Sequence, residues 1–264
     1  MENKEKLGTE NIGKLLASLA IPAVVAQIVN LLYNIVDRIY IGHIPGIGAA
    51  ALTGVGLFTP ILMMINAFAM FAGSGGAPKV SIFFGAKENE KAEKVIGNCF
   101  SFSLIVAVIL TIVFYVFAPQ LLTMFGASAA TLPYALSYAR IYILGSIFVL
   151  IVLGMNPFIT TQGFAKISMM TTVIGAVINI VLDPIFIFVF NLSVRGAALA
   201  TVLSQAVCLL FLPLLYYFKY IDAKLHIINE RYEEIVENYL KIIDDGRIND
   251  DKPTETLEEA QRYR

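Results

Sequence analysis

Six apolar blocks constrain what this chain can fold into more than any other feature of its sequence. They cover about residues 15–41, 50–71, 95–117, 136–156, 167–190 and 196–217. Each block is close to the ~20 residues that an α-helix needs to cross a hydrocarbon core of about 30 Å. Lipid offers no partner for exposed backbone groups, so such blocks cross it as helices. The sequence therefore predicts an all-α membrane protein with a bundle of six transmembrane helices.

The composition favours a lipid bilayer as the surroundings and excludes several other classes of protein. Hydrophobic residues make up 58% of the chain and charged residues only 15%, whereas an average soluble domain has about 25% charged residues. The mean hydropathy is +0.75. An ordinary water-soluble enzyme, a disordered chain and a nucleic-acid-binding protein are all excluded, and we expect no nucleic-acid partner.

Three regions are predicted along the chain. Residues 1–14 form a cytosolic N-terminal segment, residues 15–218 form the six-helix transmembrane lobe, and residues 219–264 form a polar tail. Apolar residues recur near the helical period between Ile221 and Ile243, with acids between them, which predicts one cytosolic amphipathic helix. Residues 249–264 are expected to be disordered. Whether the tail helix is inert or docks a partner stays open.

The orientation follows from the basic residues near the ends of the spans. Cytoplasmic loops collect Lys and Arg, and these residues set the topology. With a cytoplasmic N-terminus the outer side holds Arg38, Arg140 and Arg195, and the inner side holds Lys4, Lys6, Lys14, Lys79, Lys87, Lys91, Lys94, Lys166, Lys219 and Lys224. We therefore expect a multi-pass protein of the plasma (inner) membrane with both termini in the cytoplasm.

Two acidic residues, Asp37 and Asp183, lie inside apolar blocks, although the chain has 20 acids in all. A carboxylate at bilayer depth costs several kcal/mol, so it is normally paired, neutralised or placed in a wet cavity. Arg38 is adjacent to Asp37 and points elsewhere on a helix, so it is no obvious partner. The alternatives are that Asp37 reaches the headgroups from a helix end, and that Asp183 marks a bend before Pro184.

Spacing brings further oxygen atoms to the same depth. Asn179 and Asp183 are four positions apart and share one helix face. At a rise of 1.5 Å per residue, all four side chains lie about 6–16 Å from the outer loops. The four residues are Asp37, Asn179, Asp183 and Thr201. An all-oxygen set suits a hard cation such as Na⁺, and a buried carboxylate also binds H⁺ readily. We predict a cation site in the outer half of the bundle.

A glycine-rich stretch, Gly73-Ser74-Gly75-Gly76, follows the second block. No Gly-Lys-Ser/Thr sequence follows it, so a phosphate-binding loop is excluded. We expect a tight turn within the membrane instead.

Several motifs together resemble the multidrug and toxic compound extrusion (MATE) transporters, particularly the branch of staphylococcal-type multidrug exporters. The first is Asn-Leu-Leu-Tyr-Asn-Ile-Val-Asp-Arg-Ile-Tyr-Ile-Gly at 30–42. The others are Gly-Ser-Gly-Gly-Ala at 73–77, Gly-Ala-Lys at 85–87, Met-Asn-Pro-Phe at 155–158, Ile-Asn-Ile-Val-Leu-Asp-Pro-Ile-Phe at 178–186 and Gly-Ala-Ala-Leu-Ala-Thr at 196–201. The resemblance covers about residues 14–217.

The resemblance implies export of lipophilic, often cationic drugs, driven by re-entry of Na⁺ or H⁺, with no cofactor and no catalytic residue. It implies a cation site of the N-terminal lobe at Asp37, Asn179, Asp183 and Thr201. It also implies a substrate cavity lined by Tyr33, Asn156 and Asn30, and a first helix that bends at Pro22. An intramembrane enzyme is disfavoured because no His-Glu-x-x-His, paired catalytic Asp or Ser/His arrangement occurs in the spans.

The chain departs from the family in length. Full-length members carry two lobes of six helices, and only the first lobe is matched, while the polar tail resembles no family segment. Three outcomes stay open: a homodimer of two copies that exports drugs, a half-transporter without export activity of its own, and an interaction subunit that needs a partner half.

Overall fold

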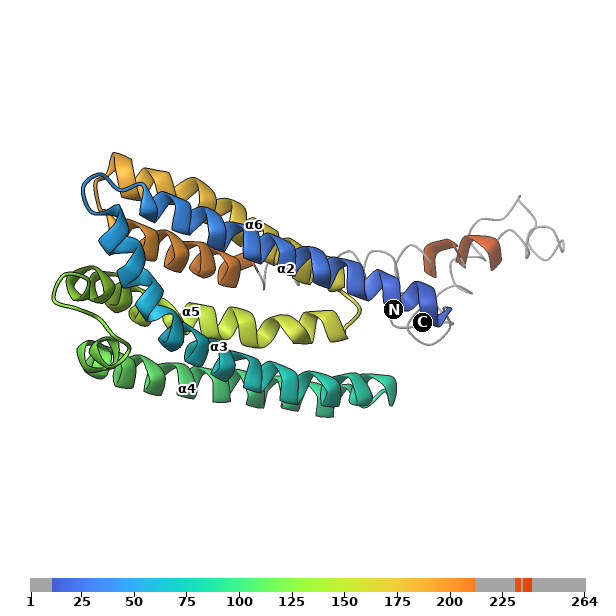
Figure 1. Cartoon of the computed structure of the whole chain (residues 1–264). Coiled ribbons are helices and arrows are strands. Elements are labelled where there is room, and N and C mark those ends of the chain that lie inside the picture. The colour runs from blue at the N-terminus through green and yellow to red at the C-terminus, as the bar shows by residue number, and fades with distance from the viewer. Residues whose placement is uncertain (1–10, 212–230, 234, 239–264) are drawn as a thin grey trace, which may run out of the picture. The chain divides into compact units, whose positions relative to one another are not determined.

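The computed structural model describes residues 11–211, 231–233 and 235–238. It contains α2 (Ile12–Gly42), α3 (Gly48–Gly85), α4 (Asn89–Met124), α5 (Leu132–Thr161), α6 (Ala165–Pro184), the π-helix η1 (Ile185–Val189) and a further helix, Val194–Phe211 (Figure 1). Within these residues, six helical segments are long and apolar enough to cross a membrane. The predicted six-helix bundle is confirmed. The predicted tail helix lies mostly outside the described residues. The parts of the tail that are described, residues 231–233 and 235–238, are helical.

Short connections make successive helices antiparallel. The start of α2 and the α3–α4 and α5–α6 connections lie at one end of the bundle, and the other connections lie at the opposite end (Figure 1). Lys87 and Lys166 belong to the first end, whereas Arg38 and Arg195 belong to the second. These basic residues are thus divided between the two ends as their positions in the sequence predict, and the direction of the bundle in the membrane remains a prediction.

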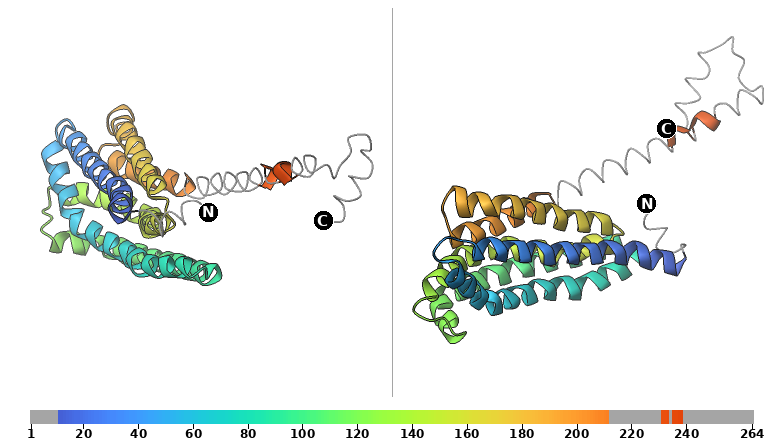
Figure 2. Two further views of the ribbon diagram at one scale, coloured as in Figure 1. Left: turned by 90° about the vertical axis from the view of Figure 1, so that its right-hand side faces the viewer. Right: turned by 45° about the horizontal axis from the view of Figure 1, so that its top comes forward.

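The helices pack in two groups that the helix Val194–Phe211 joins. α3, α4 and α5 pack together, while α2 packs mainly on α6, and Figure 2 shows these two groups on different sides of the bundle. Val194–Phe211 lies against α5, where Val202 faces Gly145, and against α6, where Cys208 faces Gly175. Its first turn touches the backbone of η1 beside Gly196. Residues from α2, α6 and Val194–Phe211 can therefore meet at one place.

The predicted turn at residues 73–76 is wrong, because α3 continues through it as one helix of 38 residues. The glycines serve close packing instead. A Cβ atom on Gly73 would lie 2.8 Å from the carbonyl oxygen of Gly154 on α5, and one on Gly76 would lie 2.7 Å from the ring of Phe158. No water competes for backbone hydrogen bonds in lipid, so the helix tolerates these glycines, and small residues let two backbones approach.

Proline has a visible effect at one of the predicted bends. The prolines at the two predicted bends, Pro22 and Pro184, both lie inside helices. Pro184 has no N–H to donate one turn back, and the chain continues after it as the π-helix η1 rather than as α-helix. Asp183 is therefore held in the last α-helical turn, directly before a wider one.

Candidate cation site

Asp37 of α2 and Asp183 of α6 meet inside the bundle. Their exposed fractions are 8% and 0%. The charge of Asp37 acts on the Asp183 carboxyl group, so the two side chains lie close together. The side chain of Arg38 reaches Thr59 on α3 at 3.5 Å, and the described residues contain no salt bridge to either aspartate.

Helix geometry adds an amide and a hydroxyl group beside the two carboxyl groups. Asn179 lies one turn before Asp183 on α6, and its Nδ2 donates to Thr201 Oγ1 at 3.3 Å. Thr201 Oγ1 in turn donates to the carbonyl oxygen of Ala197 at 3.1 Å. Since the Asn179 amide nitrogen is engaged in this way, its oxygen remains available on the same side chain. The side chains of Asn179 and Thr201 are both buried.

Four oxygen atoms at this place are buried and have no hydrogen-bond partner among the described residues. They are Asp37 Oδ1, Asp183 Oδ1, Asp183 Oδ2 and Asn179 Oδ1. A buried polar atom of this kind costs free energy unless something satisfies it. A small hard cation or a proton suits an all-oxygen set that carries two carboxylates. The arrangement is chemically able to bind one positive charge.

Aromatic side chains surround the carboxyl pair, and sequence reasoning missed two of them. Tyr138 and Tyr142 of α5 are buried, lie close enough to Asp37 to interact with its charge, and stack with ring centroids 5.9 Å apart. Phe58 of α3 packs edge-on against both rings, at 5.5 and 5.3 Å. The signal was present in the sequence, since two tyrosines four positions apart share a helix face and a buried hydroxyl needs a polar partner.

The residues predicted to line the substrate cavity lie in different places. Tyr33 is near the pair, close enough to interact with the charges of Asp37 and Asp183. Asn30 lines an open groove of about 620 Å³ along α2, together with Gln27 and Asn34.

The structure does not bring Asn156 and Pro22 next to the carboxyl pair. Asn156 follows Tyr142 by 14 positions on α5, which is about 21 Å along the helix axis. Its buried Oδ1 has no hydrogen-bond partner among the described residues. Pro22 is buried in α2, 15 positions before Asp37.

Comparison with known proteins gives consistent matches over this region. The MatE family profile matches residues 22–185. The multidrug export protein MepA of Staphylococcus haemolyticus is 30% identical over 201 residues, which are 76% of this chain and 44% of that protein. MepA of Staphylococcus saprophyticus is 29% identical over 192 residues, which are 73% and 42% of the two chains. The chain spans less than half the length of these relatives.

Solved structures agree with the sequence matches. The crystal structure of MATE in the bent conformation superposes with a TM-score of 0.74 and 33% identity, covering 80% of this chain and 46% of that one. A MOP superfamily transporter from Pyrococcus furiosus superposes with a TM-score of 0.70 and 34% identity, covering 75% and 43%. The similarity thus extends over the described bundle.

Proposed function

Because the chain belongs to the MatE family and is a multi-pass membrane protein, we propose that it forms one lobe of a drug exporter driven by Na⁺ or H⁺. It acts as an antiporter and not as an enzyme. The single observation that carries this proposal is the meeting of Asp37 and Asp183, from α2 and α6, inside the bundle. The lysine-bearing end of the bundle faces the cytoplasm, as the positive-inside rule requires.

Coupling follows from charge. When Na⁺ or H⁺ binds, it neutralises part of the negative charge that Asp37 and Asp183 place in a medium of low dielectric constant. The bound cation stabilises whichever of the outward-open and inward-open arrangements it binds more tightly. The balance between the two arrangements therefore changes when the cation binds. Asn179 and Thr201 supply neutral oxygens to the same ion and are fixed by their mutual hydrogen bond. Downhill entry of the cation can therefore drive the conformational cycle.

The substrate class follows from the same residues. A lipophilic cation is attracted by carboxylate charge and by the faces of aromatic rings, and Tyr33 places such a ring near the pair. A drug cation and a coupling cation that compete for one negative site cannot occupy it together. This competition links export of one to entry of the other.

Ion-driven efflux is the direct test. Ethidium is added to everted membrane vesicles that contain the chain. The fluorescence of ethidium is followed after a Na⁺ or H⁺ gradient is imposed across the vesicle membrane. We expect uptake of ethidium into these vesicles that depends on one of the two gradients and stops when that gradient is collapsed. Vesicles that contain the folded chain and show no gradient-dependent uptake would contradict export by this chain.

Of the three outcomes left open by the length of the chain, the homodimer that exports drugs is supported by the exposed face of α2. The amides Gln27, Asn30 and Asn34 line the open groove there, and polar groups at bilayer depth are costly when they face lipid. A second six-helix lobe on this face would cover them. The occupant we propose is a second copy of the chain, which would rebuild a two-lobed cavity.

Crosslinking tests the homodimer. Leu31 lines the groove and is 63% exposed, and Ile112 on α4 is 59% exposed. In a background with Cys99→Ala and Cys208→Ala, a photoreactive maleimide on Leu31→Cys is expected to give a two-copy product in native membranes. The matched variant Ile112→Cys is expected to give none. Equal yields from the two positions, or lipid adducts alone, would reject pairing through α2.

A further inference from the structure

Polar side chains continue from the carboxyl pair along the seam between α6 and the helix Val194–Phe211. On α6, Thr171, Gly175, Asn179 and Asp183 repeat every four positions and share one face. We define the polar seam by six buried or partly buried residues of the two facing helices: Thr171, Asn179, Thr201, Ser204, Gln205 and Cys208.

Contacts across the seam show that these two faces meet. Asn179 Nδ2 donates to Thr201 Oγ1 at 3.3 Å, and Cys208 Sγ donates to the carbonyl oxygen of Thr171 at 3.3 Å. Between these two contacts lies Gly175, where a Cβ atom would stand only 2.6 Å from Cys208 Sγ. The two helices are therefore in close contact at both ends of the interval from Thr201 to Cys208.

The hydrogen bonds leave this seam rich in acceptors. The hydroxyls of Thr171, Thr201 and Ser204 donate to carbonyl oxygens of their own helices, at 2.8, 3.1 and 2.8 Å. Each hydroxyl oxygen keeps lone pairs that can accept. Asn179 Oδ1, on a side chain that is 1% exposed, and Gln205 Oε1 are buried and have no hydrogen-bond partner among the described residues. Acceptors that lack donors in the interior of a membrane attract water and small cations.

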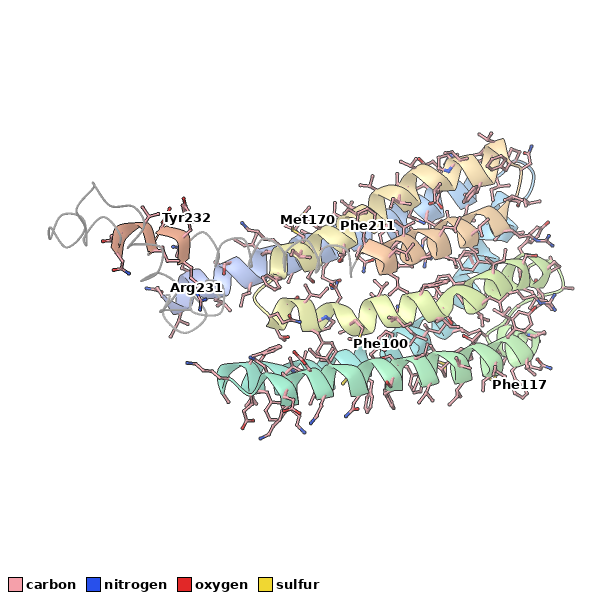
Figure 3. The ribbon with its side chains drawn as sticks, turned by 180° about the vertical axis from the view of Figure 1, so that it is seen from behind. Phe100, Phe117, Met170, Phe211, Arg231 and Tyr232 are labelled. Carbon is pink, nitrogen blue, oxygen red and sulfur yellow. The ribbon has the colours of Figure 1, made fainter. Side chains whose placement is uncertain are left out.

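The seam leads away from the carboxyl pair toward one membrane face. Thr171 precedes Asp183 by 12 positions, which is about 18 Å along α6. The helix begins at Ala165, about 9 Å further on. Met170 of α6 and Phe211 of the facing helix lie toward this same end (Figure 3). Polar side chains are thus present along about two thirds of the distance from Asp183 to the start of α6.

From these observations we infer that the polar seam is a passage for water and a small monovalent cation, leading from the Asp37–Asp183 pair to the membrane face at which α6 begins. The inference deepens the proposed function and rests on it, because it gives the bound cation a route that does not pass through the drug cavity. The acceptor oxygens favour a cation over an anion along the route.

Thiol reactivity with Ag⁺, an ion of the size class of Na⁺ and K⁺, tests the passage. In the background with Cys99→Ala and Cys208→Ala, a single cysteine is placed in the seam by Ser204→Cys. The matched control is Ser146→Cys on α5, since both serines are 1% exposed and both donate to a carbonyl oxygen three positions earlier, at 2.8 and 2.7 Å. Ser146 lies outside the seam, where it faces Thr111 of α4. Membranes are exposed to Ag⁺, and the thiols left unreacted are counted with a maleimide after denaturation.

We expect Ag⁺ to block the cysteine at position 204 at least about tenfold faster than the one at position 146, because a thiol in a dry core reacts only through local opening. Equal rates at the two positions would overturn the passage. The native Cys208, alone in a Cys99→Ala chain, checks the direction and does not depend on the Ser204→Cys variant folding. It lies beside Thr171, nearer the end at which α6 begins, and should react at least as fast as position 204. A slower reaction at Cys208 would overturn the proposed direction of entry.

The labelling requires no transport, so its failure is distinct from failure of the proposed function. Labelling at position 204 with efflux unaffected by aspartate substitutions would leave the passage in place and reject the coupling role. Efflux that depends on the aspartates, without labelling at position 204, would leave the exporter in place and reject the passage.

Discussion

Replacement of Asp183 by Asn is expected to lower ion-driven ethidium transport about a hundredfold, which corresponds to about 2.7 kcal/mol in the activation free energy. The substitution preserves the shape of a fully buried side chain. It removes the negative charge and the ability to take up a proton, so a bound cation no longer changes the electrostatic balance of the site. The measurement is the initial rate of gradient-dependent uptake in everted vesicles, at matched amounts of folded protein.

Asp37→Asn is expected to cause a loss of similar size, and the double variant is expected to lose little more than either single variant. Groups that act as one unit have non-additive effects, because removal of one leaves the other without its function. The control is Glu88→Gln, which removes an exposed carboxylate that pairs with Lys91 at 2.9 Å. Such surface pairs contribute little. Full transport by the two aspartate variants would reject the carboxyl pair as the coupling site.

The second large effect is expected at the packing of α3 on α5. A side chain on Gly73 would meet the carbonyl oxygen of Gly154 at 2.8 Å and the ring of Pro157 at 2.9 Å. Gly73→Leu therefore forces the two helices apart, and overpacking of this kind costs about 1–3 kcal/mol or more. We expect the midpoint of thermal unfolding in detergent to fall by roughly 5–10 °C.

The matched control for this effect lies on the same helix. Gly75 has no atom within 4 Å of the place where its Cβ would be. Gly75→Leu adds the same side chain to an open surface, so the unfolding midpoint is expected to change by only a degree or two. Equal shifts for Gly73→Leu and Gly75→Leu would show that loss of glycine from the helix, and not contact with α5, decides stability.

The same glycines show where sequence reasoning was misled. Gly73-Ser74-Gly75-Gly76 is typical of a turn in a water-soluble protein, where glycine weakens a helix. The chain instead keeps the helix to Gly85 and uses Gly73 and Gly76 as contact points. Which partner a glycine faces depends on another helix some 80 positions later in the chain, and no local pattern carries that information.

Local patterns did suffice for the six spans, for the match to the family and for the shared face of Asn179 and Asp183, because hydropathy and helix periodicity act over one helix at a time. They also marked Asp37 and Asp183 as unusual, since charge in lipid is costly wherever it occurs. That the two carboxyl groups approach each other, and that Tyr138 and Tyr142 stand beside them, was decided only when α2, α5 and α6 packed together. Contacts between separate helices depend on how their surfaces interlock, and that is a property of the assembled bundle.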